Sequence, residues 1–232
     1  MYHLIKLELK KHKIGWYIKG ALLANGIILA LLYFFTVIEQ LENEVVFQSS
    51  ADFYLFAGVL IRGTFIVFAS VLISRMVIDE FKNKTSIVLF SYPISRKTIM
   101  ASKLVFIFVL TLLTMMVSTL VVVLSFIGLH EWFHFSDNLQ FTSDQLFNQL
   151  FVLTGFNLVA AGTALVPLYF GLLKFSTPAT ILSSILIVIV TSSSFGPEFS
   201  LINILYVPIV LAFIGLLITF LAVRKVNHLE LH

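Results

Sequence analysis

Long uncharged stretches of the chain alternate with short intervals in which charged residues gather. Each uncharged stretch is close to the ~20 residues that a helix needs to cross the hydrocarbon of a membrane. The pattern therefore predicts an all-α membrane protein with six transmembrane helices, at about residues 17–38, 53–75, 104–128, 147–172, 178–195 and 201–223. No polar stretch is long enough for a separate soluble domain, so we expect residues 1–232 to form a single transmembrane domain.

The composition agrees with this interpretation. Apolar residues make up 59% of the chain and charged residues 12%, which is typical of a polytopic membrane protein and unlike a soluble domain. The chain has no cysteine, so disulfides and thiolate metal sites are excluded. The lysine-rich N-terminus lacks a small-residue cleavage site, and we expect no removable signal peptide.

The distribution of charge predicts the orientation in the membrane. With six spans, all 15 Lys and Arg residues except Arg62 fall on one side of the membrane. The Asp, Glu, Lys and Arg residues on the other side are all acidic, among them Glu39, Asp137 and Glu198. Lys and Arg concentrate in cytoplasmic loops. We therefore expect both termini and the central loop, Arg75–Lys103, to be cytoplasmic.

Residues 2–14 precede the first span and predict an amphipathic interfacial helix. Lys6, Lys10 and Lys13 separate two apolar stripes, where a helix that only lies on lipid would have one wide apolar face. Two stripes indicate contact with lipid on one side and protein on the other. A simple basic anchor for anionic lipid is the alternative.

The central loop contains a short apolar patch, Ile87, Val88, Leu89 and Phe90, that is too short to cross a membrane. Thr85 can cap a helix and Pro93 ends it, which predicts a short helix from Thr85 to Tyr92. Such a helix is marginal by itself in water, so a partner must bind its apolar face. Ser95 can start a second helix that runs past Lys103 into the third span.

Arg62 lies near the middle of the second predicted span. A charge there is costly and usually faces the interior of a helix bundle or a wet cavity. No acidic residue lies at matching depth, and Asn25 and Asn157 are the available polar partners. Two interpretations remain open: Arg62, Asn25 and Asn157 line a translocation path, or Arg62 is structural and bonds to helix carbonyls, amides or a partner subunit.

The sequence His130-Glu131-Trp132-Phe133-His134 satisfies H-E-x-x-H, in which two histidines one helical turn apart bind zinc and the glutamate acts as a base. Its position at the outer end of the third span suits an interfacial aromatic belt instead. No third ligand follows at a recognisable spacing. We expect no metal site, and keep a membrane zinc protease that uses His130 and His134 as an alternative.

Small residues occupy positions 160–164 in the fourth span, where they would allow a neighbouring helix to approach closely. Pro167 follows them, and Pro208 would kink the sixth span. The chain contains neither a phosphate-binding G-x-x-x-x-G-K-[ST] motif nor a nucleophile elbow. We therefore expect no enzymatic activity and no bound cofactor in this chain, and an energy source outside it.

The central loop resembles the first cytoplasmic loop of bacterial ABC type-2 exporter permeases. The residues that carry the resemblance are Asp79-Glu80, Lys82, Thr85, Leu89, Pro93, Ser95-Arg96 and Lys103. With the N-terminal helix and the six spans, the resemblance covers essentially the whole chain. It implies a multi-pass subunit of the bacterial plasma membrane that pairs with a second permease, as a homodimer or heterodimer, to form half of a translocation path.

The resemblance also implies a cytoplasmic ATPase partner, which holds ATP and magnesium, and no nucleic acid. The helix Thr85–Tyr92 would be the coupling helix that docks on this ATPase. The coupling residues would be Thr85, Ile87, Val88, Leu89, Phe90, Pro93, Glu80 and Arg96. The 24 Phe residues and the small outer loops favour amphipathic peptides, such as toxin or antimicrobial peptides, as the substrate; efflux of drugs or lipid-like antibiotics is the alternative.

Overall fold

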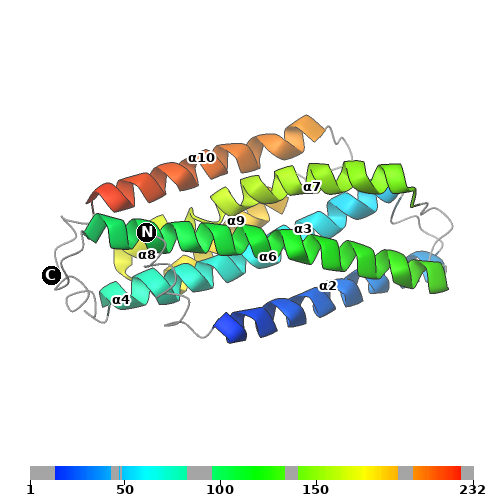
Figure 1. The fold of residues 1–232 in the computed structure, drawn as a ribbon, viewed down its shortest axis with the longest axis horizontal. Coiled ribbons are helices and arrows are strands. Elements are labelled where there is room, and N and C mark those ends of the chain that lie inside the picture. Colours follow the sequence, from blue (N-terminus) through cyan, green and yellow to red (C-terminus); the bar gives the residue numbers. More distant parts are fainter. Residues whose placement is uncertain are drawn as a thin grey trace. The chain divides into compact units, whose positions relative to one another are not determined.

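The computed structural model describes residues 14–42, 47, 49–82, 96–133, 141–192 and 201–225. Within these ranges every regular element is a helix, which confirms the all-α prediction for them (Figure 1). The elements are α2 (Ile14–Glu42), α3 (Ser50–Ile73), the π-helix η1 (Ser74–Ile78), α4 (Asp79–Lys82), α6 (Arg96–Phe133), α7 (Ser143–Thr163), α8 (Pro167–Lys174), α9 (Thr177–Ser192) and α10 (Leu201–Lys225).

Among the described residues, five helical stretches are long and apolar enough to cross a membrane. They are Gly15–Glu39, Ser50–Lys82, Lys97–Trp132, Asp144–Leu173 and Tyr206–Arg224. The fifth predicted span, 178–195, corresponds to α9, an apolar helix of 16 residues. At 1.5 Å per residue α9 is about 24 Å long, less than the ~30 Å of the hydrocarbon core. The count of six spans therefore stays a prediction, whereas a multi-pass helical architecture is confirmed.

The helices next to the central loop extend beyond the predicted spans. The second span was placed at 53–75, but the helical stretch continues to Lys82. The third was placed at 104–128, but α6 begins at Arg96, which agrees with the prediction of a helix that starts after Ser95 and runs past Lys103. The reason is that charged residues mark where apolar surface ends, while the hydrogen-bond ladder of a helix continues into polar sequence.

The fourth predicted span, 147–172, lies within one helical stretch, Asp144–Leu173, whose hydrogen bonding tightens at residues 164–166. α7 ends at Thr163, and residues 164–166 form a tight turn in which the N–H of Val166 donates to the Thr163 carbonyl at 3.0 Å. Pro167 then opens α8. Proline suits the first turn of a helix, because the N–H group that it lacks has no partner there. The proline noted in the sequence thus starts a new helix.

The described residues pack as two compact units, and the boundaries between them fall inside α3, α6 and α7. Unit 1 contains the described residues of 65–112 and 158–232, and unit 2 those of 14–64 and 113–157.

An aromatic cluster forms the core of unit 2. The ring of Phe53 lies 4.2 Å from that of Phe126 and 5.7 Å from that of Phe141, measured between ring centroids. Phe47 and Tyr54 contact Phe53 at 5.8 and 5.7 Å in edge-to-face arrangements. Aromatic rings bury much apolar area and favour such tilted contacts. The cluster therefore ties the start of α3 to the end of α6.

Small residues bring α7 and α10 together in unit 1. A Cβ added at Gly162 would lie 3.0 Å from the Cβ of Ala212, and one at Gly215 would overlap the carbonyl oxygen of Gly162. The hydroxyl of Thr163 donates to the carbonyl of Pro208 at 3.1 Å. This agrees with the close helix approach that the small residues at 160–164 predict.

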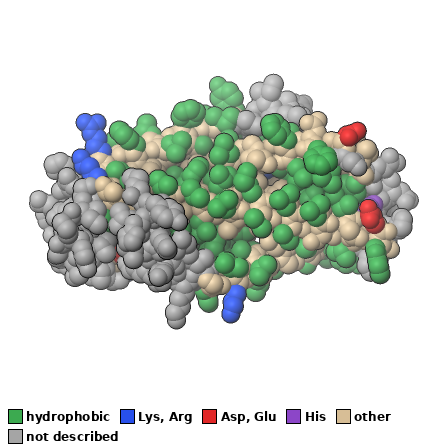
Figure 2. All heavy atoms as spheres, in the orientation of Figure 1, with side chains coloured by type: hydrophobic (Ala, Val, Ile, Leu, Met, Phe, Trp, Pro, Cys, Tyr) green, Lys and Arg blue, Asp and Glu red, His purple; other side chains and the backbone are tan. Residues whose placement is uncertain are grey.

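Large apolar side chains are exposed along the long helices, including Phe213, Phe220, Leu124 and Leu186. Figure 2 shows hydrophobic side chains spread over much of the described surface in that view. A soluble protein rarely exposes so much continuous apolar surface. The helices are therefore suited to contact with lipid.

Candidate functional site at the base of the central loop

The whole of the predicted coupling helix, Thr85–Tyr92, lies outside the described residues. This holds for Thr85, Ile87, Val88, Leu89, Phe90 and Pro93, and also for residues 2–13 of the predicted interfacial helix. The structure describes the two ends of the central loop instead. Its first part forms η1 and α4, which ends at Lys82, and its last part is the start of α6, from Arg96.

A π-helical turn, η1, lies at the start of the central loop. In η1 the N–H group of Asp79 donates to the carbonyl of Ser74, five residues earlier. Met76, Val77 and Ile78 are all buried, so three consecutive side chains contact protein. Single π-helical turns are rare in proteins, and those that occur are often found at functional sites.

A buried ion pair joins the two ends of the loop. The ammonium of Lys103, on α6, donates to the carboxylate of Glu80, on α4, and to the carbonyl of Met76 at 3.1 Å. The side chains of Lys103 and Glu80 are 3% and 13% exposed, so the charges are largely removed from solvent. Separating such a pair would leave a buried charge without compensation. The pair therefore holds α4 and α6 together.

A second set of contacts attaches the turn between α8 and α9 to the same place. The hydroxyl of Thr177 donates to Oδ1 of Asp79 at 2.9 Å. The rings of Phe81 and Phe175 lie 5.9 Å apart. Phe175 has a positive φ of 45° and its N–H caps α8 by donating to the carbonyl of Gly171. A bulky residue adopts this left-handed conformation rarely, so the packing of its ring compensates a backbone cost.

Gly171 allows α8 to lie close to η1 and α9. A Cβ at this position would lie 2.7 Å from Cδ1 of Ile78 and would overlap the hydroxyl of Thr180. Because only a hydrogen fits there, the α8–α9 hairpin packs directly against η1. We call Asp79, Glu80, Phe81, Lys103, Phe175 and Thr177 the loop-base cluster.

Three residues of the sequence motif, Asp79, Glu80 and Lys103, thus meet in the loop-base cluster. Thr177, which bonds to Asp79, and Phe175, which contacts Phe81, were not predicted. One signal in the sequence does mark Lys103: it follows Ile99 and Met100 and precedes Ile107 at helical spacing, and all four are buried. A lysine on an apolar helical stripe needs a buried acid, and the only acids near the loop are Asp79 and Glu80.

Arg62 lies in unit 2 against an aromatic ring. Its guanidinium carbon is 4.9 Å from the centre of the Phe156 ring, within the range of a cation–π interaction. Its Nη1 atom occupies the space that a Cβ on Gly58 would fill, 2.8 Å from that position. This nitrogen is buried and has no hydrogen-bond partner among the described residues.

The two predicted amide partners do not bond to Arg62. Asn157 donates to the hydroxyl of Thr119 at 2.9 Å, and its Oδ1 atom is buried without a partner in the described part of the chain. The same is true of Oδ1 of Asn25. Unit 2 therefore holds a buried donor and two buried acceptors with unused hydrogen-bonding capacity, all on the residues that we predicted to line a translocation path.

His130 packs among aromatic rings. It stacks on Phe126, with centroids 6.5 Å apart and planes at 10°, and meets the edge of Phe141 at 5.3 Å. His134 lies outside the described residues. Where side chains are described, no group of three or more His, Cys, Asp or Glu could hold a metal ion. The geometry of His130 is that of a packed ring.

The comparison with known proteins defines the class. Residues 4–191 match the model of the ABC-2 family transporter proteins, so the chain belongs to this family and is a transmembrane subunit of an ABC transporter. An ABC-2 permease implies an ATPase partner, as the loop motif predicted. The chain is 41% identical over 225 residues to the uncharacterized protein YcbO of Bacillus subtilis (strain 168), which covers 97% of this chain and 98% of YcbO. No solved structure gives a significant match.

Proposed function

We propose that the chain is the permease of an exporter for amphipathic peptides, such as toxin or antimicrobial peptides. Two permeases, identical or different, would form the path across the bacterial plasma membrane, with both termini in the cytoplasm. ATP and magnesium would bind to the separate ATPase, and the chain itself would have neither enzymatic activity nor a cofactor.

The observation that carries the coupling role is the buried Glu80–Lys103 pair at the base of the loop. Between its two ends lies a basic segment with the apolar patch Ile87–Phe90. A docking helix transmits force only if its two ends are held, because a loosely attached helix would move without moving the spans. The pair supplies this attachment, and the patch is the surface that we assign to the ATPase.

The choice of substrate rests on unit 2. A guanidinium over an aromatic ring and two amide oxygens, all with unused hydrogen-bonding capacity, can bind both apolar side chains and polar groups. An amphipathic peptide offers both, and its carboxylates suit Arg62. We therefore assign Arg62, Asn25 and Asn157 to the translocation path.

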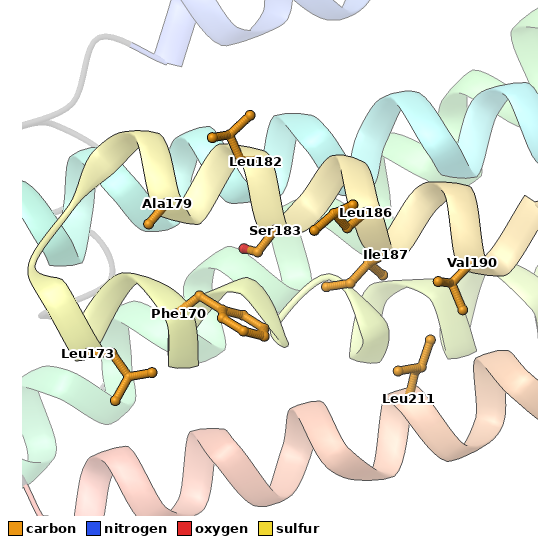
Figure 3. A pocket seen from close by; sticks show the side chains of 9 residues that line it. All are labelled: Phe170, Leu173, Ala179, Leu182, Ser183, Leu186, Ile187, Val190 and Leu211. Carbon is orange, nitrogen blue, oxygen red and sulfur yellow. The ribbon is translucent and has the colours of Figure 1, made fainter.

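One observation favours efflux of drugs or lipid-like antibiotics as the second candidate function. An open cavity of about 370 Å³ lies among α8, α9 and α10. Ser183 is its only polar lining residue among Phe170, Leu173, Ala179, Leu182, Ser183, Leu186, Ile187, Val190 and Leu211 (Figure 3). An acyl chain or a lipid-like drug could occupy such an apolar surface.

ATP hydrolysis by the reconstituted complex tests the substrate. The chain and the ATPase encoded nearest to it would be purified together and placed in liposomes. We expect an amphipathic helical peptide to stimulate hydrolysis, and a scrambled peptide of equal composition without an apolar face to have no effect. Stimulation by lipid-like antibiotics alone would support the second function, and an ATPase that never copurifies would contradict both.

The docking patch is tested separately. Exchanging Leu89 for Asp should prevent copurification of the ATPase, because a charge would replace an apolar contact at the interface. Lys97→Gln is the control, since Lys97 is exposed on the first turn of α6 and lies outside the patch. Equal retention of the ATPase by both variants would exclude the assigned patch.

A further inference from the structure

We propose that the α8–α9 hairpin is the moving element that the central loop drives, and that the loop-base cluster joins the two into one rigid lever. The inference rests on the proposed coupling of the loop to an ATPase. It adds which helices move when the loop is displaced: α8 and α9, which are far from the loop in sequence.

The first link of the lever is electrostatic. Lys103 is almost fully buried and donates both to Glu80 and to the carbonyl of Met76. An exposed pair could separate during each ATPase cycle at little cost, whereas a buried pair cannot. The end of η1, α4 and the start of α6 must therefore move together when the loop is displaced.

The second link connects these elements to the hairpin. Phe175, in the turn between α8 and α9, contacts Phe81. Thr177, the first residue of α9, bonds to Asp79. Gly171 adds direct packing of α8 on Ile78. These three contacts, a hydrogen bond, a ring contact and close packing, lie within a few residues of one another. A shift of α4 would therefore move the turn between α8 and α9.

The junction between the hairpin and the helix that precedes it is irregular. The tight turn at residues 164–166 interrupts the α-helical ladder between α7 and α8. Bonds from residue i to i−3 replace the regular ladder there, and Pro167 has no N–H to donate. Helices bend preferentially at such points, so α8 can tilt about residues 164–167. The apolar cavity borders this hairpin on the α10 side, so a tilt of α8 and α9 would change its width (Figure 3).

Distances between spin labels test the lever. The chain has no native cysteine, so pairs can be placed without removing any. Lys82 and Pro178 are exposed, one on α4 and one on α9, and report on the lever; Pro178 and Arg224 report on movement against α10. In the complex with its ATPase, we expect ATP to leave the Lys82→Cys/Pro178→Cys distance unchanged and to shift the Pro178→Cys/Arg224→Cys distance.

The outcomes separate this inference from the proposed function. An ATPase that does not bind contradicts the proposed function and the lever with it. If the ATPase binds and ATP changes the Lys82–Pro178 distance, the lever is contradicted but the proposed function is not. Binding with no change at either pair also excludes the hairpin as the moving element.

A double variant separates positioning from stability. Glu80→Gln with Lys103→Met removes both charges, which buried pairs often tolerate, and should keep the fold and the bound ATPase. We expect substrate-stimulated ATP hydrolysis to fall about tenfold, because the loop no longer moves the hairpin. Lys97→Gln is the exposed control and should keep full stimulation. Full stimulation in the double variant, or a fall only in parallel with its thermal stability, would overturn the positioning role of the pair.

Discussion

Gly58 illustrates how a missing side chain makes room for a charge inside a membrane span. Side chains of a helix lean toward its N-terminus, so Arg62 reaches back toward Gly58, one turn earlier. Its guanidinium then lies over Phe156, and its Nη1 atom takes the place of a Cβ. The ring compensates part of the cost of the charge. Gly58 and Phe156 therefore explain how α3 accommodates an arginine.

Gly58→Ala should destabilise the protein. The added Cβ would meet Nη1 of Arg62 and Cδ2 of Leu153 at 2.8 and 2.7 Å. Both atoms are side-chain ends that can shift, so we expect a loss of about 1 kcal/mol, the lower end of the cost of overpacking. Thermal unfolding in detergent, followed by tryptophan fluorescence, measures the effect. Gly155→Ala is the matched control, because nothing lies within 4 Å of its Cβ position. Equal stability of the two variants would contradict the packing of Arg62 on Gly58.

His130→Phe tests the alternative of a zinc site. Because the His130 ring packs on Phe126 and against Phe141, a phenyl ring should preserve the fold and the stimulated ATP hydrolysis. His130→Ala, which removes the ring, should lower thermal stability. Zinc would be measured by mass spectrometry in the purified protein. Stoichiometric zinc that disappears in His130→Phe would instead favour a metal role for this histidine.

At the scale of elements, α7 and α10 depend on the absence of side chains where they cross. Gly162 and Gly215 face each other, and the Cβ of Ala212 is in contact range. Lipid gives helices little hydrophobic drive to associate, so close packing between small residues has to supply the attraction. This explains why a short run of Ala and Gly in the sequence fixes a helix pair.

Gly215→Ala should weaken the α7–α10 contact. Its Cβ would overlap a backbone carbonyl, which cannot move aside as a flexible side chain does, so we expect a loss of about 2 kcal/mol or more. Thermal unfolding again measures it. Gly128→Ala, on an open part of α6, is the control and should not lower the unfolding temperature, because its Cβ meets nothing and alanine favours a helix over glycine. An unchanged temperature for Gly215→Ala would rule out the close crossing.

Element boundaries were predicted less well than element types. The helical stretch Ser50–Lys82 extends beyond its apolar run, and the fourth span changes its hydrogen bonding at residues 164–166 although its hydropathy is continuous. Hydropathy measures preference for lipid, whereas a helix ends where its backbone hydrogen bonds end. Pro167 was visible, but whether it kinks a helix or starts a new one depends on its neighbours.

At the scale of the whole molecule, the distribution of Lys and Arg predicts an even number of crossings. α9 decides the count, since its 16 residues are few for a span. If α9 crosses, the start of α6 and the end of α10 lie on the same side of the membrane. If α9 does not cross, five long helices place them on opposite sides.

Labelling of introduced cysteines tests the orientation. An impermeant maleimide should label Asp144→Cys in intact cells, and should label Lys97→Cys and Arg224→Cys only after the membrane is opened, because positive residues stay inside. All three positions are exposed, and the cysteine-free parent is the control. Labelling of Arg224→Cys in intact cells would mean that α9 does not cross.

The sequence alone determined that this protein is helical, crosses a membrane several times and belongs with the ABC-2 permeases, because these properties follow from lengths of apolar runs and from a local motif. It also singled out Arg62 as a charge inside a span, and Glu80 and Lys103 as residues of the loop motif. Only the tertiary structure decided what these charges contact. The pairing of Glu80 with Lys103 and of Asp79 with Thr177, and the place of Arg62 over Phe156, join residues 23 to 98 positions apart or on different helices. Such contacts depend on how helices pack, and the pattern along a single helix does not specify its neighbours.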